Sequence, residues 1–87
     1  MTLPTLHPNG TSPDRLAEAY ERAYDAVQAA YEAVRETAPN ARDYYVQDSD
    51  AMRRACDEHQ HRLHHLHTVL AELDELVGHC ERKVVAS

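Results

Sequence analysis

The sequence contains no Phe and no Trp, and only two of its 87 residues are Gly. Ala, Glu, Leu and Arg, which are good helix formers, are abundant instead. This composition disfavours an all-β or an α/β fold and predicts an all-α fold. A chain of this length forms one domain at most, and it lies below the size at which a single core is comfortably stable. Oligomerisation is therefore expected from length alone.

Long apolar runs are also missing. No segment approaches the roughly 18 consecutive apolar residues of a membrane span. The first ten residues have neither the basic leader nor the apolar core of a secretory signal. We therefore expect a cytoplasmic protein that has no membrane partner.

The balance of charges excludes one class of partner. Nine Lys and Arg residues are scattered among fifteen Asp and Glu residues, and the formal net charge is −6. Binding of a polyanion normally requires a clustered basic face, so duplex nucleic acid is not an expected partner. Catalysis is not expected either, because neither a Ser/His/Asp or Cys/His arrangement nor an isolated pair of carboxylates can be placed on firm geometry.

The seven His residues are the first candidates for metal binding. His61 and His65 are four residues apart, after Asp57 and Glu58, and such a pair can bind zinc or nickel with a carboxylate. The spacing arises easily by chance in a His-rich run, and H-E-x-x-H is absent, so we expect a solvated or interface face, no metal and no cofactor. His59 falls in the apolar repeat and is expected to be a hydrogen-bonded core or interface residue.

The only two cysteines are 24 residues apart on one predicted helix, or about 36 Å if that helix is unbroken. An intrachain disulfide between Cys56 and Cys80 would require the helix to melt. Cytosolic thiols also normally stay reduced. We therefore expect both residues to act as small buried hydrophobic side chains.

A first helix is predicted for residues 13–37, after an extended N-terminal arm and cap at 1–12. Ser12 is a typical N-cap, Pro13 suits the first helical position and Asp14 suits the first turn. Pro39 ends the helix. Apolar residues follow at alternating spacings of four and three: Leu16, Tyr20, Ala23, Val27, Ala30 and Val34. Tyr24 and Tyr31 lie beside this heptad pattern and are candidates for the wall of a groove or an oligomer contact.

A second helix is predicted for residues 50–83, after a linker at 38–49 in which Asp48 or Ser49 provides the cap. Its heptad pattern is longer: Met52, Cys56, His59, Leu63, Leu66, Leu70, Leu73, Val77, Cys80 and Val84. The helical segment 13–87 is thus predicted to be an antiparallel hairpin. Two helices alone leave half of each apolar stripe exposed. We therefore expect a homodimer with a four-helix bundle, or a higher oligomer, with the arm covering part of the stripe through Leu3 and Leu6.

Two short polar motifs are not explained by the helical repeat. The first is the loop before the first helix, whose donors come from Asn9, Gly10, Thr11, Ser12 and Arg15. The second is the linker segment Arg42, Asp43, Tyr44 and Tyr45. Loop donors and arginines can hold a phosphate, and tyrosine rings can stack on a base. In a hairpin the two motifs lie at opposite ends, so a joint pocket would have to form between subunits. Structural capping and packing of tyrosines over a bundle end are the simpler alternatives.

The combination of "LHPNGTS" before a helix and "PNARDYY" between two helices resembles a set of small phage and prophage proteins of unassigned function. The resemblance covers nearly the whole chain, although Ala41 stands where these phage proteins usually have glycine. The resemblance implies a phage accessory protein in the host cytoplasm, a type that often acts as a binder in anti-defence. We therefore expect a non-catalytic protein that sequesters a nucleotide-like ligand between subunits. The alternative is an interaction module that inhibits a host protein through its acidic helical surface.

Overall fold

The chain folds into two long α-helices joined by a linker that contains one turn of 3-10 helix. The computed structural model describes residues 1–86, and the side chains of residues 1–82. Helix α1 spans Pro13–Arg35, the 3-10 helix η1 spans Ala41–Asp43, and α2 spans Ala51–Ala86. Residues 1–86 contain no strand, so the prediction of an all-α fold is confirmed. Neither long helix combines the length and the apolar character needed to cross a membrane over the described residues.

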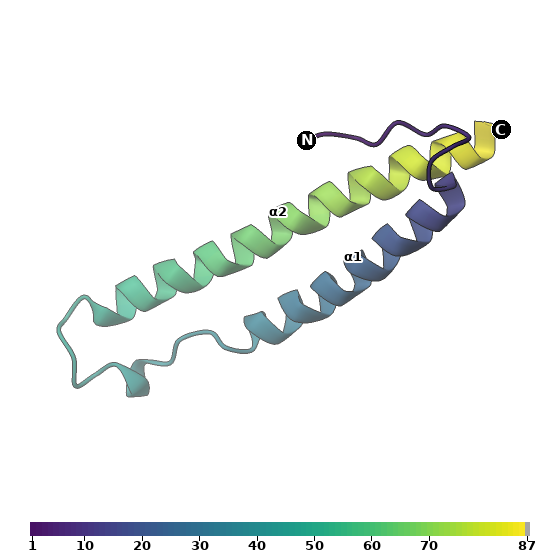
Figure 1. The fold of residues 1–87 in the computed structure, drawn as a ribbon. Helices are drawn as coiled ribbons and strands as arrows, with labels where there is room; N and C mark the ends of the chain where they lie inside the picture. Colours follow the sequence, from purple (N-terminus) through teal and green to yellow (C-terminus); the bar gives the residue numbers. More distant parts are fainter. Residues whose placement is uncertain (87) are drawn as a thin grey trace.

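The two long helices lie side by side and run in opposite directions (Figure 1). Together they form a rod that measures 61 × 20 × 18 Å. Its radius of gyration is 18.8 Å, whereas a compact domain of this length would have about 12 Å. Helix α2 has 36 residues and α1 has 23, so the linker runs beside the part of α2 that extends beyond α1.

Helix α1 begins at the predicted residue but is capped differently from the prediction. Ser12 is the N-cap, with an extended backbone, and Pro13 occupies the first helical turn. The Ser12 hydroxyl accepts no hydrogen bond from the backbone of that turn. It lies instead beside the Asp14 carboxylate and, together with backbone amides of the first turn, lowers the pKa of Asp14. The capping effect at this end therefore comes from proline and a negative charge near the positive end of the helix dipole.

The start of α2 is fixed by Asp48, one of the two predicted caps. Its carboxylate accepts the backbone N–H of Asp50 at 2.9 Å. The same carboxylate accepts two hydrogen bonds from Arg54, at 3.1 and 2.8 Å. This contact with Arg54 lowers the pKa of Asp48. The linker thus turns into α2 through hydrogen bonds that its own side chains provide.

The N-terminal arm packs along the C-terminal half of α2 (Figure 1). His79 Nε2 donates a hydrogen bond to the Pro4 carbonyl oxygen at 2.8 Å. Leu3 and Leu6 of the arm are half-buried, and Cys80, which follows His79 in α2, is fully buried. Both cysteines are free thiols.

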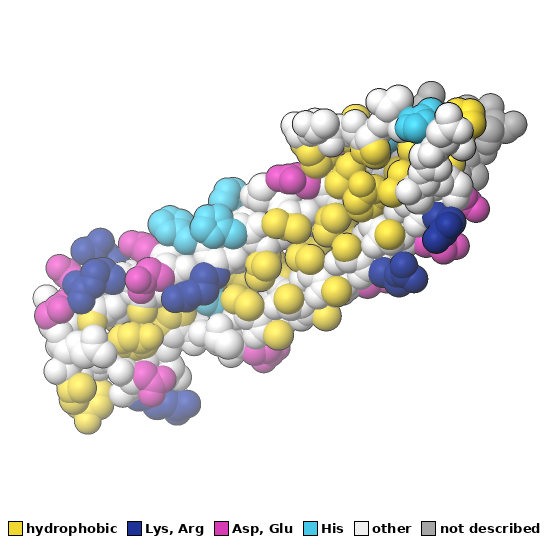
Figure 2. Space-filling view, viewed as in Figure 1, with side chains coloured by type: hydrophobic (Ala, Val, Ile, Leu, Met, Phe, Trp, Pro, Cys, Tyr) yellow, Lys and Arg dark blue, Asp and Glu magenta, His cyan; other side chains and the backbone are white. Residues whose placement is uncertain are grey.

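The core is thin, because a pair of helices cannot enclose large side chains on all sides. Six of the described residues are buried: Ala17, Ala51, Ala55, His59, Leu70 and Cys80. Most of the larger apolar side chains are only half-buried. Figure 2 shows these hydrophobic side chains in a band that runs along the rod over both helices.

The heptad pattern of the first helix describes its contact with α2 only in part. Ala30, a predicted heptad position, is exposed, and Ala17, which is outside the pattern, is buried. Tyr24 and Tyr31 face α2. The side of α1 that contacts α2 therefore lies closer to Tyr24 and Tyr31 than the heptad pattern predicts. The tyrosine rings reach α2, whereas Ala30 of the pattern remains at the edge of the contact.

Candidate functional site

The loop before α1 presents its polar groups to solvent. Its predicted site residues Asn9, Gly10, Thr11, Ser12 and Arg15 are all exposed. The Gly10 N–H donates to the His7 carbonyl oxygen at 3.1 Å and closes a turn. A Cβ atom at Gly10 would lie 3.0 Å from His7 Nε2, so glycine allows the His7 ring to fold against this turn.

The linker segment is held by its backbone and leaves its side chains free. The Asn40 side chain accepts the backbone N–H of Arg42 at 3.0 Å, which fixes the start of η1. Arg42 and Asp43 are exposed, and Tyr44 is half-buried. Tyr45 is 80% exposed, which is unusual for a large aromatic side chain. The guanidinium of Arg42 forms no ion pair with any side chain of residues 1–82.

The two motifs of one chain do not come together. They lie at opposite ends of the rod (Figure 1), separated by the length of α1. That helix has 23 residues, or about 35 Å at 1.5 Å per residue. A single copy therefore cannot form the predicted pocket, and the predicted ligand-binding residues remain two separate half-sites.

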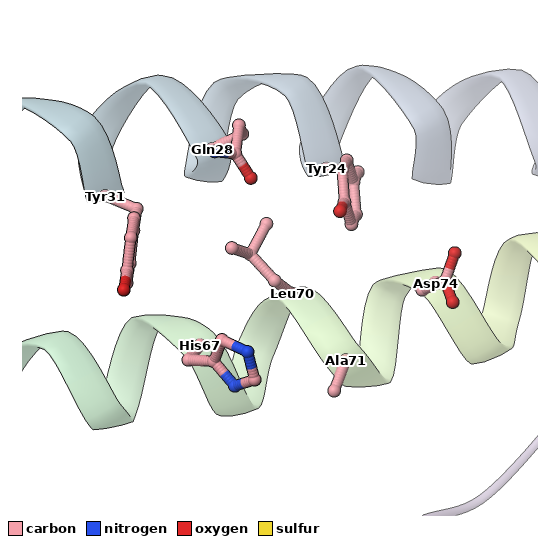
Figure 3. Close-up of a pocket in the computed structure, with 7 residues that line it drawn as sticks. All are labelled: Tyr24, Gln28, Tyr31, His67, Leu70, Ala71 and Asp74. Carbon is pink, nitrogen blue, oxygen red and sulfur yellow. The ribbon is translucent and has the colours of Figure 1, made fainter.

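A groove lies between α1 and α2, near the middle of the rod. None of the predicted ligand-binding residues lines it. Its volume is about 280 Å³, and it is lined by Tyr24, Gln28, Tyr31, His67, Leu70, Ala71 and Asp74. Figure 3 shows the two tyrosine rings projecting from α1 towards α2, with Leu70 rising between them. The sequence indicated the tyrosines as a groove wall. It gave no signal for the facing residues, because these depend on how the two helices are aligned.

Acidic side chains surround one end of this groove. A smaller hollow of about 120 Å³ lies beside it and is lined by Glu21, Tyr24, Asp25, Asp74 and Val77. A hydrogen bond with Glu81 of α2, partial burial and the charges of Glu81, Asp25 and Glu18 raise the pKa of Glu21. The two carboxylates thus face each other across the helix pair. Among residues 1–82, none of these acids forms an ion pair with a Lys or Arg side chain.

Replacing Glu21 by Gln is expected to raise the Tm of the protein at pH 7. A carboxyl whose pKa is raised on folding binds its proton more tightly in the native state, so wild-type stability increases as pH falls through that raised pKa. The stability gain of Glu21→Gln over wild type should be full at pH 7. It should vanish below pH 4.5, the ordinary pKa of a Glu carboxyl. Thermal melts of both proteins between pH 7 and pH 4 measure this difference.

The control for this experiment is Glu72→Gln, an exposed position on α2. It removes the same charge without a facing carboxylate. A Glu21→Gln gain that is equal to the Glu72→Gln gain, or that does not depend on pH, would show that net charge and not the Glu21–Glu81 contact is responsible.

Besides the half-buried His79, the histidines of α2 comprise one buried residue and several exposed ones. His59 is 4% exposed, in agreement with the predicted core position. Its Nδ1 atom has no hydrogen-bond partner among the described residues, so the expectation of a hydrogen-bonded core histidine is wrong for this atom. His61, His64, His65 and His67 are exposed along α2. Among the described residues, no three His, Cys, Asp or Glu side chains lie close enough together to hold a metal ion.

Comparison with known proteins does not extend this description. The sequence matches no protein-family model, and no curated protein or solved structure is significantly similar to it.

Proposed function

We propose that this chain is a non-catalytic binding protein that acts as a homo-oligomer of antiparallel helix pairs. The ligand is a small nucleotide-like molecule, which is sequestered between subunits. One subunit contributes the loop Asn9, Gly10, Thr11 and Ser12 with Arg15. Another contributes the linker segment Arg42, Asp43, Tyr44 and Tyr45.

The exposed linker segment carries this proposal. Tyr45 is 80% exposed and the neighbouring Arg42 forms no ion pair with any described side chain. An exposed aromatic ring three residues from a free guanidinium suits a ligand that has both a flat base and a phosphate, because the ring can stack and the guanidinium can form two parallel hydrogen bonds. The loop before α1 adds uncharged donors and a second arginine.

The biological setting is also proposed. Because "LHPNGTS" and "PNARDYY" resemble segments of small phage and prophage proteins, we assign the chain to that class of accessory proteins, in the cytoplasm of the host. Sequestration needs no chemical step, which agrees with the proposal that the protein is not an enzyme. An anti-defence role would follow if the ligand is a nucleotide that the host uses as a signal.

The first test is native mass spectrometry of the protein purified from its own host, because it reports the subunit count and any retained small molecule together. Purified protein is then melted with ADP, NAD⁺ and a cyclic dinucleotide, and with adenosine and inorganic phosphate alone. We expect a nucleotide to raise Tm more than either fragment does. Arg42→Ala and Tyr45→Ala should each weaken binding of that nucleotide at least about tenfold.

Arg22→Ala is the matched control, because Arg22 is an exposed arginine on α1 outside both motifs. It should bind the nucleotide as wild type does. Equal Tm shifts for nucleotides and for inorganic phosphate would indicate a general anion effect and would contradict the proposed site.

A second candidate function is supported by the acidic groove. Glu18, Glu21, Asp25, Asp74 and Glu81 are unpaired among residues 1–82. The charges of Glu81, Asp25 and Glu18 contribute to the raised pKa of Glu21, as expected for acids that repel one another. A basic patch on a host protein would relieve this repulsion, and inhibition of that host protein would be the function. Retention of one specific host protein at moderate salt, without any nucleotide effect on Tm, would favour this alternative.

A further inference from the structure

The helix pair has one apolar face that the chain itself does not cover. Successive residues of an α-helix are turned by about 100°, which places one set of apolar side chains on the side opposite the groove. This apolar face consists of Leu16, Ala23, Val27, Ala30 and Val34 on α1 and of Leu66, Val69, Leu73 and Leu76 on α2. All nine are half-buried or exposed. Val69, at 42% exposed, lies near the middle of α2.

The exposed area of the chain indicates what covers this face. One copy exposes 6484 Å². A compact monomer of 9.9 kDa exposes about 5200 Å², so this chain has an excess of about 1300 Å². Two copies that buried this excess against each other would bury about 2600 Å², which lies within the range of obligate homodimers. A second copy of this chain therefore fits the area that is available.

The alignment of the two helices indicates how the second copy lies. The midpoint of α2, Ala51–Ala86, falls between Thr68 and Val69. In Figure 3, Gln28 of α1 stands level with Leu70 of α2, so Ala30 stands close to the same midpoint. Both Ala30 and Val69 belong to the apolar face. The small side chain of Ala30 would let two copies of α1 approach closely at that point.

We infer that two copies pack through their apolar faces, antiparallel to each other, about a two-fold axis that passes beside Ala30 and Val69. In this arrangement the middle of each α2 packs over the middle of the partner's α2. The linker end of one copy then lies over the arm end of the other, at both ends of the dimer. This inference rests on the homo-oligomer of the proposed function and deepens it, because each half-site of one copy then meets the complementary half-site of its partner.

The apolar face is tested with two matched pairs of substitutions. Val69→Glu and Ala30→Glu place a carboxylate of each copy at the axis, and each should raise the dimer Kd at least about 100-fold. Ala71→Glu and Ala29→Glu introduce the same charge at exposed positions that point away from this face, and both should leave the Kd unchanged. Sedimentation equilibrium measures the Kd, and circular dichroism checks that helix content is retained.

A monomeric wild-type chain would overturn the inference. A Val69→Glu variant that remains dimeric while Ala71→Glu dissociates would also overturn it, because the groove would then be the interface. If the dimer behaves as expected and no nucleotide binds, the interface stands and only the ligand of the proposed function is wrong.

Disulfide formation distinguishes the antiparallel arrangement from a parallel one. In a Cys56→Ala background, Val69→Cys should oxidise to a covalent dimer, because the two-fold axis brings both copies of this residue within disulfide distance. Ala71→Cys, which lies on the groove side of the same helix, should not. In a parallel dimer Val69 would lie over the partner's Ala30. Crosslinking only in a mixture of Val69→Cys and Ala30→Cys chains would therefore overturn the antiparallel arrangement.

Discussion

Removal of residues 1–8 is expected to make Cys80 react with thiol reagents at least about 100-fold faster. In the complete chain this side chain is fully buried, and burial raises the pKa of its thiol, so little thiolate is available. The arm is joined to α2 at the neighbouring residue, through the hydrogen bond from His79 to the Pro4 carbonyl. Because this contact places the arm next to Cys80 in the sequence of α2, we expect loss of the arm to expose the thiol.

The reaction is measured with a chromogenic disulfide reagent in a Cys56→Ala background, so that Cys80 is the only thiol. His79→Ala, which removes only the anchoring hydrogen bond, should accelerate labelling by a smaller factor. His67→Ala, at an exposed position, is the control and should not change the rate. If the truncated chain keeps its helix content and Cys80 remains unreactive, α1 alone buries the thiol and the role given to the arm is wrong.

Replacing His59 by Leu is expected to increase the free energy of unfolding by about 1–3 kcal/mol. The imidazole is 4% exposed and its Nδ1 atom has no hydrogen-bond partner among the described residues. Burying a polar atom without a partner costs free energy, and leucine has a similar volume without that cost. Urea denaturation at pH 7 and at one fixed protein concentration measures the change.

His64→Leu is the matched substitution, because His64 is exposed on the same helix. It accounts for the slightly better helix propensity of leucine and should change stability by a few tenths of a kcal/mol. A His59→Leu variant that is less stable than His64→Leu would show that the buried imidazole has a polar partner in the assembled protein.

Much of the fold could be predicted because local signals mark the ends of both helices. Pro13 and Asp14 placed the start of α1 correctly, and its end at Arg35 is two residues before the predicted residue 37. Helix α2 continues to Ala86, three residues beyond the prediction. The sequence could not predict which apolar residues of each helix contact the other helix and which remain uncovered. A heptad pattern marks apolar positions along each helix, although Ala17, Ala51 and Ala55 are buried outside it. It does not separate the contact between α1 and α2 from a contact with another subunit.

The candidate site was predictable only as two separate motifs. The loop at Asn9–Ser12 and the segment at Arg42–Tyr45 were recognisable because no helical repeat explains them. Their separation to opposite ends of one chain was predicted from the hairpin and agrees with the structure. A meeting of the two motifs between subunits remains a prediction, because the order of residues in one chain does not determine it. The facing residues of the groove, such as His67 and Asp74, were missed for a related reason: the alignment of two helices is a tertiary property.

The measurement that tests this account most directly is ADP binding by mixed dimers. Arg15→Ala and Arg42→Ala each remove one of the two arginines from every site. Each variant alone should therefore bind ADP at least about tenfold more weakly than wild type. In a dimer that contains one chain of each kind, one site has both arginines and the other has neither. After subunit exchange in an equal mixture, about half of the dimers are mixed, so about a quarter of all sites should regain wild-type affinity. Titration calorimetry that detects this fraction would support the inter-subunit site. A mixture that binds no better than the separate variants, although the dimers exchange, would contradict it.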